Sequence, residues 1–210
     1  MFPAGCRLLR RLPPDSTQCV LDHTDAIVAR DLAKVLFAQA DPTNTAKPGP
    51  ELWMRARDTL KAAFPQGQGR SDYVALLARA YNRLSEFADA ARMLDSVRVT
   101  VWEGAHEVHD LFVEAHLSLG EAHLKAGHAA EALAEFNRAL EYPENLATGK
   151  LENACAASVH YLRGNAFLAL GQKEQALEAW KKAVDEPTSK DAHQEEARQK
   201  ARQALANAAK

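Results

Sequence analysis

The sequence is poor in cysteine, and the cysteines it has are badly spaced for cross-linking. Only three of its 210 residues are cysteine, at Cys6, Cys19 and Cys155, and no two of them form a C-x-x-C pair. An odd number of widely separated cysteines supports neither a disulfide framework nor a zinc knuckle. We therefore expect reduced thiols, with Cys155 a buried structural residue near the start of a helix.

Long apolar runs are also missing. No segment approaches the ~18 uninterrupted apolar residues of a membrane span, which argues against a transmembrane helix. Residues 1–20 hold arginine and proline where a secretory signal needs an apolar run of about 7 to 15 residues. These absences predict a cytoplasmic protein with no membrane partner.

Helix-breaking residues and charge of one sign are scarce as well. The chain has 10 glycines and 9 prolines, and 7% of its residues are aromatic, whereas alanine, the strongest helix former, is abundant. This composition favours an all-α protein. The formal net charge is −2, and the C-terminal third mixes basic with acidic residues, which argues against nucleic acid as a partner.

Three segments of the chain repeat one pattern. They are residues 77–97, 119–140 and 163–184, and they align without a gap. Each places a small residue, a ring, an alanine, a bulky residue and a small apolar residue at the same relative positions. In chain order these are Ala78, Tyr81, Ala90, Leu94 and Val97; Gly120, His123, Ala132, Phe136 and Ala139; and Gly164, Phe167, Ala176, Trp180 and Ala183.

The spacing predicts that each segment is a pair of antiparallel amphipathic helices. We expect the first helices to end, and the chain to turn, at Leu84–Ser85, Ala126–Gly127 and Leu170–Gly171, where glycine relieves a left-handed backbone. Small residues where the helices touch allow an interaxial distance of about 8–10 Å, and the bulky residue fills the remaining space. Because one hairpin cannot bury its apolar face alone, neighbouring hairpins must stack.

This pattern resembles the tetratricopeptide repeat, whose consensus pairs a small and an aromatic residue in the first helix with alanine, an aromatic residue and alanine in the second. Residues 163–184 are the closest copy, and residues 77–97 the weakest, because Leu94 and Val97 replace the aromatic residue and the alanine. The resemblance implies an all-α solenoid of stacked helical hairpins, a non-catalytic scaffold that binds a protein or peptide on its concave face. The small residues are 42 and 44 residues apart, instead of the usual ~34.

The insertions between repeats carry a second resemblance. Residues 102–104, Trp-Glu-Gly, and residues 142–146, Tyr-Pro-Glu-Asn-Leu, resemble the repeat-bearing C-terminal region of large bacterial proteins with an uncharacterised mutarotase-like carbohydrate domain. This implies an alternative function, an accessory C-terminal tail that docks on a carbohydrate domain absent from this chain.

The domain organisation follows from these repeats. We expect a repeat domain over residues 51–210, with repeat cores at 71–98, 106–141 and 156–185 and a C-terminal capping helix at 189–208. Residues 106–126 read as one long helix. Residues 1–50 should form a helical N-terminal segment followed by a proline-rich linker at 41–50.

Local signals place the helix ends outside the repeats. One or two helices are expected within residues 20–40, with Asp22 or Thr24 as the N-cap. A helix over residues 51–63 should be ended by Pro65. Thr188 with Asp191 resembles a capping box. The helix that follows carries a thin apolar stripe, which suits a solenoid cap and consists of Ala197, Ala201, Leu205 and Ala208.

The histidines do not match a metal site. Residues 106–109, His-Glu-Val-His, are one residue short of the zinc-protease motif H-E-x-x-H. His109, His116 and His123 share a helical face, but successive members lie about 10.5 Å apart, too far for a zinc ion with ~2.0 Å bonds. The sequence also lacks a nucleophile elbow and a phosphate-binding loop. We expect no metal, no cofactor and no enzymatic activity.

The resemblance also implies the binding residues. In that family the concave face exposes the residues one, four and five positions after the small residue. The corresponding residues are Arg79, Asn82 and Arg83; Glu121, Leu124 and Lys125; and Asn165, Leu168 and Ala169. Asn165 matches an asparagine that holds a peptide backbone in many members, although it can equally be a solvated surface residue. Glu121 stands where a second asparagine would help to clamp a terminal carboxylate, so a chaperone-tail receptor is disfavoured.

Overall fold

The computed structural model describes residues 25–40, 50–100, 105–150 and 154–208, and every regular element within those ranges is helical. The elements are α1 (Ala26–Gln39), α2 (Pro50–Ala62), α3 (Phe64–Gly67), α4 (Ser71–Arg83), α5 (Phe87–Ser96), α6 (Ala105–Lys125), α7 (Ala129–Arg138), the 3-10 helix η1 (Glu144–Leu146), α8 (Ala157–Ala169), α9 (Lys173–Asp185) and α10 (Ala192–Ala208). The all-α prediction is confirmed. The expectations for residues 1–24, for the linker at 41–49 and for residues 102–104 lie outside the described residues.

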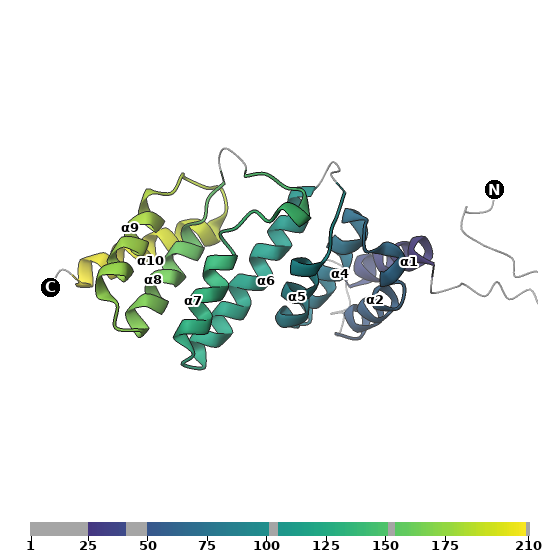
Figure 1. Cartoon of the computed structure of the whole chain (residues 1–210), viewed down its shortest axis with the longest axis horizontal. Coiled ribbons are helices and arrows are strands. Elements are labelled where there is room, and N and C mark those ends of the chain that lie inside the picture. The colour runs from purple at the N-terminus through teal and green to yellow at the C-terminus, as the bar shows by residue number, and fades with distance from the viewer. Residues whose placement is uncertain (1–24, 41–49, 101–104, 151–153, 209–210) are drawn as a thin grey trace, which may run out of the picture.

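The helices stack as consecutive hairpins along the long axis of the molecule (Figure 1). The hairpins are α1/α2, α4/α5, α6/α7 and α8/α9, and α10 packs against α9 and α8 at the end opposite α1. The first helices of the hairpins form one row with α10, in which each helix contacts the next. The predicted solenoid of stacked helical hairpins is confirmed.

The helices of this row run parallel to one another. Side-chain contacts join successive members, namely Arg30–Asp72 (3.1 Å) between α1 and α4, Arg79–Glu107 between the second half of α4 and the start of α6, and the N–H of Ser158 to Gln194 Oε1 (2.9 Å) between the starts of α8 and α10. The helices of the row are parallel to one another because an antiparallel helix lies between successive members along the chain.

Small residues hold the two helices of each hairpin close together. A Cβ placed on Gly120 would lie 2.5 Å from the ring of Phe136, and one placed on Gly164 would collide with the indole of Trp180. The three alanines of the repeated pattern, Ala90, Ala132 and Ala176, are fully buried. The predicted interlocking of small and bulky residues is therefore confirmed, and it explains why the repeats superpose without a gap.

The turns inside the three repeats are also confirmed. Ser85, Gly127 and Gly171 have φ angles of 59°, 84° and 75°, and each lies two positions after the last residue of α4, α6 or α8. A left-handed backbone costs a residue with a Cβ about 1–2 kcal/mol, which glycine avoids. The first repeat carries this cost at Ser85.

Two expected helix ends near the N-terminus are wrong. The N-cap of α1 is Asp25, whose carboxylate accepts hydrogen bonds from the N–H groups of Ile27 and Val28, and not Asp22 or Thr24. Pro65 does not end α2, which stops at Ala62; it lies in the first turn of α3. A proline is tolerated there because first-turn N–H groups have no partner within the helix.

The cap helix starts later than expected. Asp191 is its capping residue and accepts from the N–H of His193 (2.9 Å), so the assignment of Thr188 to the cap is wrong. Glu195 reaches back to the N–H of Ser189 (2.8 Å) and ties the preceding chain to the helix. The predicted apolar stripe packs on α8 and α9, with Ala201 fully buried.

Residues 142–146, in the long connection between α7 and α8, contact the first two repeats. The side-chain amide of Asn145 donates to the carbonyls of Leu94 (2.9 Å) and Val97 (2.7 Å), and Leu146 is fully buried in the core. Tyr142 stacks on His109 with 4.1 Å between ring centroids. The residues added to the usual repeat length therefore contact both the α4/α5 and the α6/α7 hairpins and help to hold them together.

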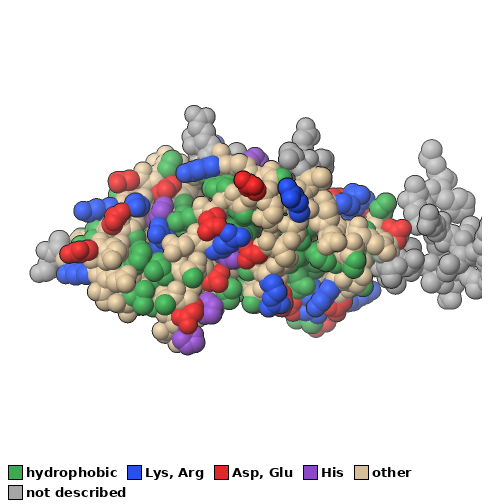
Figure 2. All heavy atoms as spheres, in the orientation of Figure 1, with side chains coloured by type: hydrophobic (Ala, Val, Ile, Leu, Met, Phe, Trp, Pro, Cys, Tyr) green, Lys and Arg blue, Asp and Glu red, His purple; other side chains and the backbone are tan. Residues whose placement is uncertain are grey.

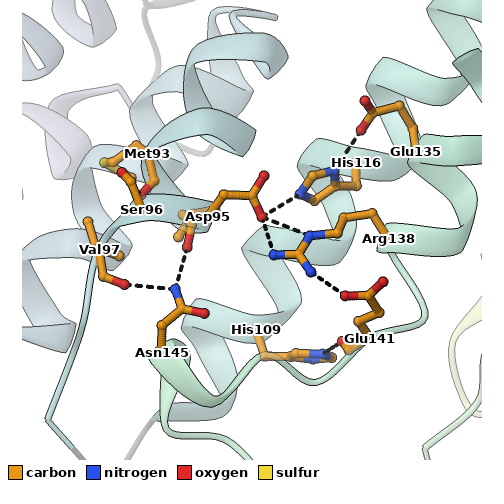
Figure 3. A network of polar contacts seen from close by, with 11 residues as sticks. Met93, Asp95, Ser96, Val97, His109, His116, Glu135, Arg138, Glu141 and Asn145 are labelled. Carbon is orange, nitrogen blue, oxygen red and sulfur yellow. Dashed lines mark hydrogen bonds and ion pairs between the residues drawn. The ribbon is translucent and has the colours of Figure 1, made fainter.

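A polar network fixes α5, α6 and α7 beside this connection (Figure 3). Arg138 donates to Asp95 at 2.6 and 2.8 Å and also pairs with Glu141. The buried His116 shares a hydrogen bond with Glu135 (2.7 Å), and its other ring nitrogen faces Asp95 at 3.7 Å. His109 and His116 are thus packing residues that join helices.

Candidate functional site

A groove of about 830 Å³ lies between α6, α8 and α10, the last three helices of the parallel row. Within that row α6 and α8 touch each other far less than α4 touches α6 or α8 touches α10. The long connection between α7 and α8 separates the two helices, and its residues Leu140 and Tyr142 line the groove beside them. The added length between repeats thus creates the hollow.

One wall of the groove is a stripe along α6. Asp110, Glu114, Leu117 and Glu121 all line it, because residues at intervals of three and four share a helical face. Asp110 and Glu114 are exposed, and Glu121 is half-buried. Glu114 accepts a hydrogen bond from the amide of Asn82 (3.0 Å). The wall is therefore mainly acidic, with Val113 and Leu117 as its apolar positions.

The floor of the groove is apolar. Leu140 from the connection, Tyr161 and Leu162 from α8, and Leu117 from α6 line it, and all four are half-buried. Partly exposed apolar side chains in a concave surface are the usual anchors for a ligand, and polar groups at the margin then set its orientation.

The opposite wall is formed by α10. Lys200 pairs with Glu196 (2.8 Å), and the hydrogen bond to this carboxylate, followed by its negative charge, raises the pKa of Lys200 above its usual value. Gln194 accepts from the N–H of Ser158 and closes the end of the groove. Lys200 of α10 and Glu121 of α6 both line the groove.

His160 sits where the groove meets the connection before α10. Burial lowers the pKa of His160, and this outweighs the attraction of Glu186 at 3.4 Å. Glu186 also accepts from the N–H of Ala156 at the start of α8 (3.0 Å). The carboxylate of Glu186 therefore contacts both the start of α8, through the N–H of Ala156, and the imidazole ring of His160.

The structure places the expected binding residues of the first repeat apart from this groove. Arg79 pairs with Glu107 and lines a smaller hollow between α1, α4 and α6. Asn82 is buried and donates to the carbonyl of Leu111 (3.2 Å) as well as to Glu114, so the expectation that Asn82 is exposed is wrong. The close packing of α6 on α4 covers it. Arg83 is exposed at the end of α4.

Of the expected residues in the second and third repeats, only Glu121 lines the groove. Lys125 is exposed and pairs with Glu121 one turn away (3.2 Å). Asn165 is half-buried and accepts a hydrogen bond from the indole N–H of Trp180 (3.2 Å). Leu168 is half exposed near the end of α8, and Leu124 packs on the apolar core of the second repeat. Ala169 is exposed beside Leu168.

Sequence reasoning missed the walls of the groove. Asp110 and Glu114 lie before Gly120, the small residue from which the binding positions of the second repeat were counted. The helix α10 lies outside the three repeats. The spacing of Asp110, Glu114, Leu117 and Glu121 is a signal that could have identified the α6 wall. No signal in the sequence shows how far α8 is displaced from α6.

Two further properties of the described residues bear on function. Within residues 25–40, 50–100, 105–150 and 154–208, no group of three or more His, Cys, Asp or Glu side chains is arranged to hold a metal ion. Among the helices of those same ranges, none combines the length and the apolar character needed to cross a membrane. On the face shown in Figure 2, acidic and basic side chains are interspersed over the stack.

Comparison with known proteins identifies the repeats that build this site. Residues 113–146 and 157–186 match the family model of the tetratricopeptide repeat. Each of these two segments therefore has the sequence pattern of one tetratricopeptide repeat. The two matches cover the helices from the middle of α6 to the end of α9, so they include two of the three helices that line the groove.

The fold is similar to solved structures at low sequence identity. One, described as the crystal structure of MamA, is 15% identical with a TM-score of 0.48, and the match covers 85% of this chain and 83% of that chain. A second, described as the crystal structure of MamA protein, is 15% identical with a TM-score of 0.46 and coverages of 85% and 78%. No curated protein matches the sequence.

Proposed function

We propose that this protein is a non-catalytic scaffold that binds an extended segment of a protein partner in the groove between α6, α8 and α10. The groove supports this proposal because α6 and α8, two first helices of tetratricopeptide repeats, form it together with the cap helix α10, and because it has an apolar floor between polar walls. Its volume of about 830 Å³ lies within the ~300–1,000 Å³ typical of ligand sites.

The structure changes which residues we assign to binding. Glu121 remains, and Asp110, Glu114, Leu117 and Tyr161 join it because all of them line the groove. Asn82 and Asn165 are assigned to folding, since their amides already bond to Leu111, Glu114 and Trp180 in the free protein. Arg79, Arg83 and Lys125 do not line the groove, and their role in partner binding stays a prediction.

The alternative function, docking on a carbohydrate domain, gains no support from the described residues. Tyr142 and Asn145, which carry that resemblance, contact other repeats of this chain. It stays a prediction, as do the cytoplasmic location and the bacterial source.

A peptide-mapping experiment tests the proposal. Peptides selected from a display library on the full-length chain would be added to ¹⁵N-labelled protein while backbone amide shifts are followed. We expect the largest shift changes in residues 105–121, 154–162 and 191–200, with small changes in α5, α7 and α9. Shift changes concentrated on the second helices, or no peptide binding below about 1 mM, would contradict the proposed function.

A further inference from the structure

The groove carries an excess of negative charge. Two lysines, Lys150 and Lys200, line it together with six carboxylates, which are Asp110, Glu114, Glu121, Glu186, Asp191 and Glu196. Lys200 is already paired with Glu196 at 2.8 Å. Among the described residues, no cation lies within ion-pair distance of Asp110 or Glu114, and both side chains are exposed.

An acidic wall beside an apolar floor selects one kind of occupant. A segment with arginine or lysine on one side would pair with Asp110 and Glu114. Leucine side chains on its other side would bury themselves against Leu117 and Tyr161. An acidic or purely polar segment would be disfavoured, because like charges brought together at an interface cost binding energy.

The chain itself contains such a segment. Residues 6–12, Cys-Arg-Leu-Leu-Arg-Arg-Leu, combine three arginines with three leucines and no acidic residue, and the first carboxylate of the chain is Asp15. Its charge is opposite to that of the groove, and its leucines match the apolar floor.

The start of α1 lies within reach of the groove. The first helices of the hairpins run parallel to one another, and the groove is lined by residues between His106 and Glu121 of α6, between Ser158 and Leu162 of α8, and between His193 and Lys200 of α10. Two helix spacings of about 10 Å separate α1 from α6, which is the nearer wall of the groove. The thirteen residues 13–25 can span up to about 43–47 Å, which exceeds that separation.

We propose that residues 6–12 occupy the α6–α8–α10 groove of their own chain and compete there with the partner segment. This inference rests on the proposed function, because it uses the same groove. A tether of this kind gives an effective concentration on the order of 1 mM. If the free segment binds with a Kd of about 0.1 mM, about 90% of the grooves are filled and an added peptide binds about tenfold more weakly.

Photo-crosslinking in the full chain tests where the segment lies. Leu9 is replaced by the photoreactive benzoylphenylalanine, and equal amounts of ¹⁴N- and ¹⁵N-labelled chains are mixed, irradiated and digested. We expect crosslinks from residue 9 to peptides of α6, α8 or α10, each with both halves carrying the same isotope. Crosslinks to α5, α7 or α9, or pairs of mixed isotope that show binding between two copies, would overturn the proposal.

Peptide competition tests the effect on binding. The probe is a fluorescein-labelled peptide of residues 5–13 carrying Cys6→Ser, and its affinity is measured by anisotropy. We expect it to bind the full chain with Arg7→Glu, Arg10→Glu and Arg11→Glu about tenfold more tightly than the parent chain. Adding Asp110→Asn to that variant should weaken binding several-fold, whereas adding Glu131→Gln, at an exposed carboxylate of α7, should not. Equal affinity for parent and triple variant would overturn the proposal.

The two proposals fail in different ways. If display-selected peptides shift the groove amides while residue 9 crosslinks elsewhere, the inference about residues 6–12 falls and the proposed function stands. If neither those peptides nor residues 5–13 perturb the groove, both fall.

Discussion

The indole of Trp180 occupies the space beside Gly164 that any larger side chain at residue 164 would fill. The indole N–H donates to the carbonyl of Tyr161 and to Asn165 Oδ1, both at 3.2 Å, so the ring cannot shift without losing hydrogen bonds. This contact joins α8 to α9, and it makes residue 164 intolerant of an added methyl group.

Gly164→Ala should therefore destabilise the protein. Overpacking of this kind costs about 1–3 kcal/mol, from which up to ~1 kcal/mol is recovered because alanine favours a helix more than glycine. We expect a net loss of about 1–2 kcal/mol in the free energy of unfolding by urea. Gly149→Ala is the matched control, since a Cβ there would meet no atom within 4 Å. Equal stability of the two variants would contradict the interlocking of Gly164 and Trp180.

Asn145→Ala should loosen the connection between α7 and α8. Its amide satisfies the carbonyls of both Leu94 and Val97, and each lost hydrogen bond costs about 1 kcal/mol. We expect a loss of about 2 kcal/mol in the free energy of unfolding. Hydrogen exchange should also become faster at Val99, whose N–H donates to the main-chain carbonyl of Asn145 (2.9 Å). Asn137→Ala, at an exposed position of α7, should leave both measurements nearly unchanged.

The packing inside each hairpin could be predicted from the sequence because it depends on local spacing. A small residue and a bulky residue sixteen positions apart, such as Gly120 and Phe136, must meet once a turn of known length joins their helices. The same holds for the left-handed residues Ser85, Gly127 and Gly171, whose positions follow from the helix ends.

The candidate site could not be predicted to the same extent, because it depends on contacts between hairpins. Whether Asn82 is exposed is decided by how closely α6 approaches α4, because the Asn82 amide donates to the carbonyl of Leu111 in α6. The groove residues Asp110 and Glu114 become available only because the connection before α8 separates that helix from α6. None of these distances is encoded in the repeated pattern.

Ser85→Gly should stabilise the first repeat. Ser85 has a φ of 59°, and a left-handed residue with a Cβ pays about 1–2 kcal/mol that glycine avoids. Part of this gain is lost because glycine is freer in the unfolded chain. We expect a net gain of about 0.5–1 kcal/mol in the free energy of unfolding. Gly171→Ser, at a φ of 75°, is the reverse test and should lose a similar amount. A loss on Ser85→Gly would show that the serine hydroxyl stabilises the turn.

Acidification should weaken the third repeat through His160. Burial lowers the pKa of His160 in the folded protein, and the positive charges of Arg163, Lys182 and Lys150 lower it further, against the attraction of Glu186. The unfolded chain, with a histidine pKa near ~6.5, then binds the proton more tightly than the folded protein. The stability that comes from burying the neutral imidazole of His160 is therefore fully present above the pKa of the unfolded chain. It is lost progressively as the pH falls toward the lower pKa of the folded protein.

His160→Gln should consequently flatten the pH dependence of stability. We expect the melting temperature of the parent to fall more steeply between about pH 6.5 and 5.5 than that of the variant. His193→Gln removes an exposed histidine from the start of α10 and should keep the parent's slope. Parallel curves for parent and His160→Gln would mean that the folded protein binds this proton as tightly as the unfolded chain, with the Glu186 carboxylate at 3.4 Å offsetting the cost of burying the charged ring.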